Sequence, residues 1–156
     1  MTQPSTIRIF VDADACPVKD EIYRVAGRYS LPTFIVSNQW LLVPQTPLIE
    51  RVVVEQGPDV ADDWIAEQAG ARDIVVTNDI PLAARCIASG ASILRPDGRV
   101  IDEHAIGGVK AVRDLMDSLR ETGVATTRNP PFSKQSRSAF LSALDTMIVR
   151  LKKRAI

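Results

Sequence analysis

Several features that would assign this chain to a common class are absent from its 156 residues. No apolar run approaches the roughly 18 residues that a membrane helix needs. Residues 1–6 form a polar lead without the basic and apolar regions of a secretory signal. The two cysteines, Cys16 and Cys86, lie far apart and form no CxxC pair, so we expect reduced thiols rather than disulfides or a zinc site. These absences predict a cytoplasmic protein with no membrane partner.

The chain also carries no net charge, but its charges are unevenly distributed. Residues 1–104 hold 9 basic and 15 acidic side chains, a net charge of −6, whereas residues 105–156 hold 10 and 4, a net charge of +6. The second part ends in a basic run at residues 150–154. We expect this part to hold an anionic partner that is processed at the first part. The alternative is an ordinary solvated helix face and a frayed tail.

Short runs rich in valine and isoleucine alternate with amphipathic helical patterns along most of the chain. The expected strands are residues 7–11, 33–37, 51–55, 74–77 and 92–94. The expected helices are residues 18–29, 59–69, 81–88, 109–121 and 136–153. This order predicts one α/β domain over residues 1–156, a three-layer sandwich whose parallel sheet has helices on both faces. Residues 109–153 would form a C-terminal helical annex.

Two segments of this pattern leave alternatives open. The proline-containing stretch at residues 41–49 argues against a central strand, so we interpret it as a loop or an edge segment. Trp40 in that stretch either stacks on a nucleobase or anchors the loop. The apolar stripe of residues 136–153 packs either on its own chain or on a second subunit, so a homodimer is one expectation.

The most informative motif is Asp12-Ala13-Asp14, which directly follows the first expected strand. Residues two apart on an extended segment point to the same side, so both carboxylates should emerge together at the carboxyl end of that strand. Ligands of open α/β sheets bind at this edge. Two carboxylates held close together repel each other unless a cation lies between them. A hard divalent metal, which prefers oxygen ligands, is the expected cation.

Two further acidic groups lie beside expected helix starts. Asp59, Asp62 and Asp63 fall in the first turn of one helix, where acidic residues also act as caps and favour the helix dipole. Asp79 follows the strand at residues 74–77 and precedes a helix, so it is either an N-cap or a site residue. Together with Asp12, these groups predict a Mg²⁺ or Mn²⁺ site on one edge of the sheet, suited to phosphodiester hydrolysis.

Four motifs taken together resemble the YaiI/YqxD family of bacterial proteins. They are residues 10–18, which contain Asp12-Ala13-Asp14, residues 61–65, residues 76–83 and Pro131-Phe132-Ser133. The resemblance covers roughly residues 7–151. It implies membership of the PIN-like group, whose folds are compact parallel α/β sandwiches and whose active members are ribonucleases that depend on Mg²⁺ or Mn²⁺.

The resemblance also implies roles for particular residues. Asp12 matches the acidic residue after the first strand of PIN-like nucleases, Asp79 the one before a later helix, and Asp62 or Asp63 the mid-chain acid. Asp97 is a candidate fourth acid. The mid-chain acid is usually Glu in those nucleases and is Asp here. Ser136 stands in a segment where an acidic residue is expected.

The leading hypothesis is therefore a metal-dependent nuclease that acts on RNA. Asp12, Asp14, Asp79 and Asp97 would bind the metal, and Asp62 or Asp63 would complete the site or orient water. The residues expected to hold phosphates are Lys134, Arg137, Lys152, Lys153 and Arg154.

Two other hypotheses stay open. One is a phosphohydrolase of the haloacid dehalogenase type, in which Asp12 is the nucleophile and Asp14 the acid/base. That family also needs a late acidic pair after a lysine, and none follows Lys110. The other is a PIN-like module that binds nucleic acid or protein without catalysis, since a fold does not fix a function.

Overall fold

The computed structural model describes residues 7–57, 59–102 and 134–154. Its strands are β1 (Ile9–Asp12), β2 (Thr33–Ser37), β3 (Ile49–Val53), β4 (Ile74–Val76), β5 (Ser92–Leu94) and β6 (Val100–Ile101). Its helices are η1 (Ala13–Ala15), α1 (Lys19–Tyr29), α2 (Val60–Gln68), α3 (Ile80–Ala88) and α5 (Lys134–Arg154). No helix among the described residues is long and apolar enough to span a membrane. The helix expected at residues 109–121 lies outside the described residues.

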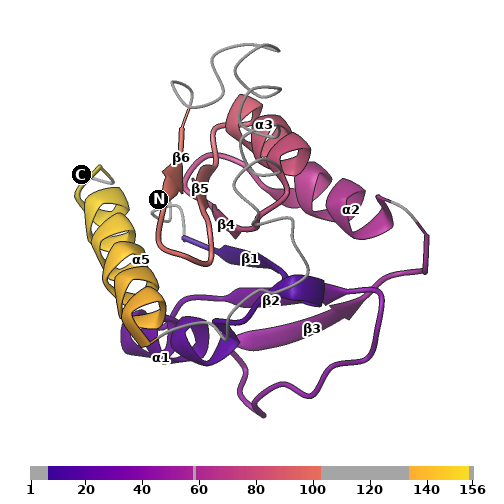
Figure 1. The fold of residues 1–156 in the computed structure, drawn as a ribbon, viewed down its shortest axis with the longest axis horizontal. Helices are drawn as coiled ribbons and strands as arrows, with labels where there is room; N and C mark the ends of the chain where they lie inside the picture. The colour runs from indigo at the N-terminus through magenta and orange to yellow at the C-terminus, as the bar shows by residue number, and fades with distance from the viewer. Residues whose placement is uncertain (1–6, 58, 103–133, 155–156) are drawn as a thin grey trace, which may run out of the picture.

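The six strands form one sheet in the order β3-β2-β1-β4-β5-β6 (Figure 1). The first five are parallel, as the alternation of strands and helices predicts. The expectation of an all-parallel sheet is wrong at one edge, where β6 pairs antiparallel with β5. The two strands are joined by a turn in which Gly98 has a φ of 92°, a backbone conformation that favours glycine. A strand of two residues is too short to show a hydrophobic period, which explains why the sequence did not reveal it.

Helices cover both faces of the sheet, which confirms the layered α/β arrangement (Figure 1). Successive residues of a strand point to opposite faces, and they enter two separate apolar cores. One core contains Val11 of β1 together with Ile22 of α1 and Phe140 of α5. The other contains Phe10 of β1 and Ile65 of α2, together with the buried side chains of α3. The apolar stripe of α5 therefore packs on its own chain.

The connection from β2 to β3 is a loop, residues 38–48, rather than the helix that usually links parallel strands. Val43 of this loop is buried in the same core as α1. The proline-rich stretch is thus a loop as predicted, and its last residue, Ile49, begins the edge strand β3. Both cysteines are free and buried, and burial raises the pKa of each thiol to about 11.

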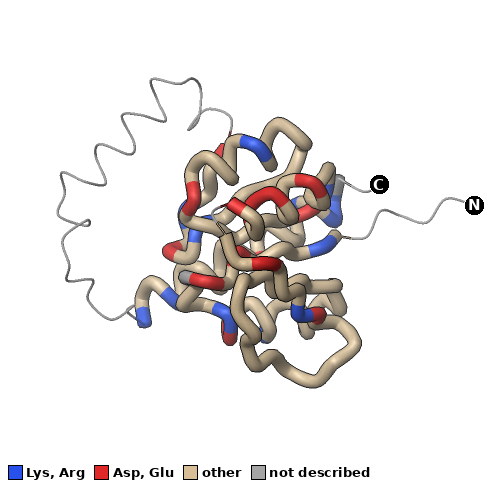
Figure 2. The backbone as a smooth tube through the Cα atoms, turned by 90° about the vertical axis from the view of Figure 1, so that its right-hand side faces the viewer, with Lys and Arg blue, Asp and Glu red and all other residues tan. Residues whose placement is uncertain are grey.

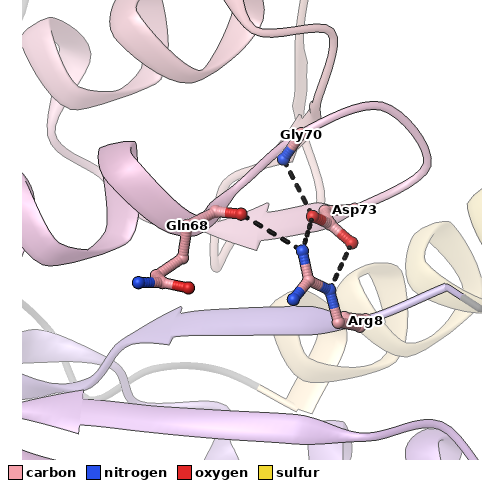
Figure 3. Close-up of polar contacts among 4 residues, drawn as sticks. All are labelled: Arg8, Gln68, Gly70 and Asp73. Carbon is pink, nitrogen blue, oxygen red and sulfur yellow. Dashed lines mark hydrogen bonds and ion pairs between the residues drawn. The ribbon is translucent and has the colours of Figure 1, made fainter.

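At the amino ends of the strands, a charged pair ties β1 to β4 (Figure 3). Arg8 donates two hydrogen bonds to Asp73, from Nε to Oδ1 at 3.0 Å and from a terminal nitrogen to Oδ2 at 2.7 Å. The same guanidinium group donates to the Gln68 carbonyl oxygen, and the Gly70 N–H donates to Asp73. The Asp73 side chain is only 3% exposed, so its charge is neutralised within the fold.

Candidate functional site

The candidate site lies between β1 and β4, where the chain stops adding strands on one side of β1 and begins to add them on the other. From β1 the chain proceeds outward to β2 and β3 on one side, and later to β4 and β5 on the other. In doubly wound sheets, ligands bind at the carboxyl ends of the two strands that flank this switch point, here β1 and β4. Figure 2 looks toward the carboxyl ends of the strands and shows acidic segments gathered on this side of the molecule.

Asp12, the last residue of β1, is held by a hydroxyl group from the residue that follows β4. Thr77 Oγ1 lies 2.9 Å from Asp12 Oδ2 and also accepts a hydrogen bond from the Asp79 N–H at 2.9 Å. Because a hydroxyl group has one proton, and the N–H fills one of its acceptor positions, that proton is donated to Asp12. Thr77 is buried, so the geometry of this link between the two strand ends is fixed by packing.

Asp14 is held in the same way from the other side. Ser37, the last residue of β2, donates its hydroxyl proton to Asp14 Oδ1 and accepts the Gln39 N–H at 2.9 Å. Ser37 is buried and Asp14 is exposed. The strands on both sides of β1 therefore each supply a hydroxyl group that orients one of its two carboxylates.

The hydrogen bonds that Ser37 and Thr77 donate to Asp14 and Asp12 were not predicted from the sequence. A signal was present, because each is followed by asparagine at the end of an apolar run, as Ser37-Asn38 and Thr77-Asn78. Hydroxyl residues at such points often accept an N–H two residues ahead in a tight turn. This pattern predicts the turn, but the partner carboxylates only become visible once the strand order is known.

Asp79 acts as the N-cap of α3, as one of its two predicted roles requires. Its Oδ1 accepts the Leu82 N–H at 2.9 Å, and Pro81 lies in the first turn of the helix. Asp62, on the first turn of α2, lies close enough to Asp79 for the negative charge of Asp79 to raise the pKa of Asp62. The cap residue is therefore also part of the acidic group.

The carboxylates influence one another's protonation. Burial first, and then the negative charges of Asp79 and Asp12, raise the pKa of Asp62 to about 6. Burial is also the main cause that raises the pKa of Asp12, with smaller contributions from Asp79 and Asp14 and an opposing one from the Thr77 hydrogen bond. The structure thus brings four of the predicted acids, Asp12, Asp14, Asp62 and Asp79, into one group, which we call the acidic edge.

The other predicted acids have different surroundings. Asp63 forms an ion pair with Arg85 at 2.7 Å, and both side chains are largely exposed. The Asp97 carboxylate accepts the Arg99 N–H at 3.0 Å and pairs with the Arg99 guanidinium group, so it bonds within its own turn. Asp59 occupies the N-cap position of α2, one of its expected roles, but its side chain makes no cap hydrogen bond and its φ is 67°. In that left-handed conformation only its carbonyl oxygen begins the helix, by accepting the Asp63 N–H.

The predicted phosphate-binding residues divide between the two ends of α5. Lys134 is exposed at the first residue of the helix, and Arg137 donates to the Pro17 carbonyl oxygen at 2.7 Å and to Glu21 at 3.3 Å. Pro17 follows Asp14 closely in the chain, so this end lies near the acidic edge. Lys152 and Lys153 are roughly 22 Å further along the helix, at 1.5 Å per residue. Lys152 lies over the Tyr29 ring, and Arg154 ends the helix.

The acidic edge has the donor atoms that a cation prefers, but its side chains are too far apart to coordinate one as they stand. Its donors are carboxylate and hydroxyl oxygens, which Mg²⁺ and Mn²⁺ prefer. Within the described residues, no Lys or Arg forms an ion pair with its four acids. However, no three His, Cys, Asp or Glu side chains in that part of the chain are close enough together to hold a metal ion. Binding would need side-chain movement, and Asp62, which is half-exposed, is the acid with room to move.

A separate hollow of about 700 Å³ lies between α5 and the strands β5 and β6. None of the four acids of the acidic edge lines it.

Comparison with known proteins identifies the family. A family model described as "Uncharacterized BCR, YaiI/YqxD family" matches residues 10–150. The chain belongs to the YaiI/YqxD family. Its similar relatives include a UPF0178 protein of Gluconobacter oxydans, 67% identical over 96% of this chain and 86% of the relative. A UPF0178 protein of Azorhizobium caulinodans is 56% identical over 97% of this chain and 95% of the relative. The family description states no activity, and no solved structure matches the chain.

Proposed function

We propose that this member of the YaiI/YqxD family is a hydrolase of phosphodiesters that depends on Mg²⁺ or Mn²⁺ and acts on RNA. One observation carries the proposal. Asp12, Asp62 and Asp79 come from three separate segments and face the switch point together, where the charge of Asp79 raises the pKa of the other two. A group of carboxylates without a basic partner in the described residues attracts a cation from outside the chain.

The acids would have different tasks. A bound divalent cation would lower the pKa of a water molecule and offset the charge that develops on the phosphate. Asp12 and Asp79 are fixed by hydrogen bonds from Thr77 and from the first turn of α3, so they suit the role of constant ligands. Asp62 has a pKa of about 6, so near neutral pH it suits the role of proton acceptor from water.

The choice of RNA rests on the basic end of α5 and on the family resemblance. Arg137 donates to the Pro17 carbonyl oxygen, three residues after Asp14, and Lys134 begins the same helix, so both would contact phosphates that flank the reacting one. The succession of Asp12, a mid-chain acid and Asp79 is similar to that of PIN-like ribonucleases, and Asp62 fits the mid-chain position better than Asp63 does. This resemblance supports RNA as the substrate and a PIN-like site as its architecture.

Cleavage of a fluorescein-labelled single-stranded RNA in Mn²⁺ tests the proposal. We expect Asp12→Asn and Asp79→Asn to lower the rate by ~100-fold or more, since even residues that only support a metal ligand contribute ~10–100-fold. Glu67→Gln is the matched control, because Glu67 is an exposed acid on the same helix as Asp62. Circular dichroism would establish that each variant is folded. Wild-type cleavage rates in both aspartate variants would refute the proposal.

The two alternatives give different results in the same experiments. A phosphohydrolase with Asp12 as nucleophile would be trapped by beryllofluoride, which mimics an aspartyl phosphate, whereas the proposed hydrolase would not. A binding module without catalysis would retain RNA in a gel-shift assay and give no cleavage at any Mn²⁺ concentration.

Replacing Asp63, which pairs with Arg85, should leave cleavage unchanged, whereas Asp62→Asn should slow it.

A further inference from the structure

An exposed apolar patch lies beyond the carboxyl ends of β2 and β3. The loop at residues 38–48 connects β2 to β3 without a helix, and it contains no charged side chain. Three of the large apolar side chains exposed in the described part of the chain lie in this region: Trp40 is 62% exposed, Leu42 78% and Val53 50%. A crossover helix would usually cover this part of a parallel sheet. The loop leaves it open at the edge strand.

Trp40 is held in a defined orientation although it is exposed. The Arg51 guanidinium carbon lies 4.1 Å from the centre of the Trp40 ring, which is a close cation–π contact. The same guanidinium group donates a hydrogen bond to the Leu41 carbonyl oxygen at 3.3 Å, so it fixes the loop as well as the ring. An indole that served only to anchor the loop would be buried. Here Arg51 supports one face of the ring, and most of the ring remains open to solvent.

The patch is connected to the acidic edge through β2. Ser37, which orients Asp14, is three residues before Trp40, and the Gln39 N–H donates to Ser37 Oγ. Arg51 of β3 pairs with Ile35 of β2, one step back from Val36, which pairs with Asp12 of β1. Neighbouring strands are about 4.8 Å apart, so the backbone of β3 at Arg51 is about 10 Å from the end of β1 across the sheet.

We propose that Trp40, supported by Arg51, is a stacking site for an unpaired base of single-stranded RNA. This inference rests on the function proposed above and adds to it a preference for single-stranded substrate. Base stacking on an aromatic side chain needs one open π face, and a neighbouring guanidinium group adds attraction for the phosphate backbone. A base on Trp40 places the adjoining backbone beside Asp14 and Asp12. In a duplex the bases are stacked on one another and cannot reach the indole.

Binding of a fluorescein-labelled oligouridylate of ten residues, measured by anisotropy in EDTA, tests the inference without cleavage. We expect Trp40→Ala to weaken binding by about 5- to 150-fold, the contribution of one stacked base. Trp40→Phe retains a π face and should restore most of the affinity. A blunt RNA duplex of the same length should bind the wild type and Trp40→Ala equally. Oligothymidylate should show the same dependence on Trp40 if the base, rather than the sugar, is recognised.

Intrinsic fluorescence reports the contact itself. The chain has two tryptophans, and Trp64 is half-buried against Phe10 and Phe34, so Trp64→Phe leaves the emission of Trp40 alone. In that variant, oligouridylate should quench the emission, as a stacked base does. Arg51→Lys keeps the charge but not the planar contact and should weaken binding less than Trp40→Ala.

Several results would overturn the inference. Equal affinity of the wild type and Trp40→Ala for oligouridylate, or no binding by the wild type, would refute it. A dimer in sedimentation experiments that Trp40→Ala dissociates, with oligouridylate affinity unchanged, would show that the patch binds a second copy of the chain. Loss of binding in Trp40→Ala without any cleavage by the wild type would refute the proposed hydrolysis but not the stacking site. Cleavage that depends on Asp12 but not on Trp40 would refute the stacking site but not the proposed hydrolysis.

Discussion

The two ends of the sheet treat buried negative charge in opposite ways. At the amino end, Asp73 is almost fully buried and is matched by two hydrogen bonds from Arg8 (Figure 3). At the carboxyl end, the four acids of the acidic edge share hydroxyl and backbone donors, and no Lys or Arg of the described residues forms an ion pair with them. The amino end is therefore a structural tie. The carboxyl end retains a charge that a partner from outside the chain can neutralise.

This difference has a consequence for stability as pH changes. The pKa of Asp62 is raised from the ordinary aspartate value near 4 to about 6, so the folded chain binds more protons than the unfolded chain between these values. Stability then falls as pH rises through this window, because the folded state must give up a proton that it favours. We therefore expect Asp62 to weaken the fold near neutral pH, as a site arranged for a ligand rather than for stability would do.

We expect the largest loss of stability when the Arg8–Asp73 pair at the amino end of the sheet is removed. Arg8→Met leaves the Asp73 carboxylate buried without its guanidinium partner, and we expect a loss of about 3 kcal/mol in the free energy of unfolding. We place the loss at the lower end of the usual range because the Arg8 side chain is 37% exposed. At this chain length the loss corresponds to a fall in Tm of about 6–12 °C, measured by differential scanning calorimetry.

An exposed ion pair provides the control for that change. Arg85→Met removes the partner of Asp63, and both side chains are largely exposed, so it should lower Tm much less than Arg8→Met does. The double variant Arg8→Met with Asp73→Asn should be less destabilised than the two single variants added together. Simple additivity would show that the pair is not coupled, and the contrast between the two ends would then be wrong.

A smaller effect is expected when the carboxyl end loses a hydroxyl group. Thr77→Val keeps the shape of a buried side chain but leaves the Asp79 N–H and Asp12 Oδ2 without their shared partner. We expect a loss of about 1–2 kcal/mol in stability and a fall in RNA cleavage of about 10–100-fold, because Asp12 is no longer oriented. Thr33→Val is the matched control, since Thr33 is also buried but its hydroxyl donates only to the Leu31 carbonyl oxygen. Equal cleavage by both variants would exclude an orienting role for Thr77.

The smallest expected change is a gain in stability, in the variant Asp62→Asn. Asp62→Asn removes a carboxyl group whose charged form is disfavoured, so the variant should be more stable than the wild type at pH 7.5 by about 1 kcal/mol, a figure reduced for solvent screening. The gain corresponds to about 2–4 °C in Tm, and it should disappear at pH 4, where Asp62 is protonated. Glu67→Gln should change Tm at neither pH. A loss of stability at pH 7.5 would mean that Asp62 is held by a favourable partner.

Much of this arrangement could be predicted from the sequence, because its signals are local. The apolar runs placed the five parallel strands within two residues, and the acids that follow β1 and β4 pointed to the correct edge of the sheet. The tie between Arg8 and Asp73 joins residues 65 apart, and no local pattern indicates it. Ser37 and Thr77 gain their roles only when β2 and β4 lie on either side of β1. The choice of Asp62 over Asp63 likewise depends on where α2 sits against α3.

Calorimetric titration with Mn²⁺ measures whether the acidic edge binds a divalent cation, as we propose. We predict binding by the wild type at or below millimolar concentration, loss of binding in Asp12→Asn, and unchanged binding in Glu67→Gln. At pH 6, in buffers of different ionisation enthalpy, binding should release about half a proton, because Asp62 is about half protonated there. No binding by the wild type at millimolar Mn²⁺, or equal binding by Asp12→Asn, would contradict the account.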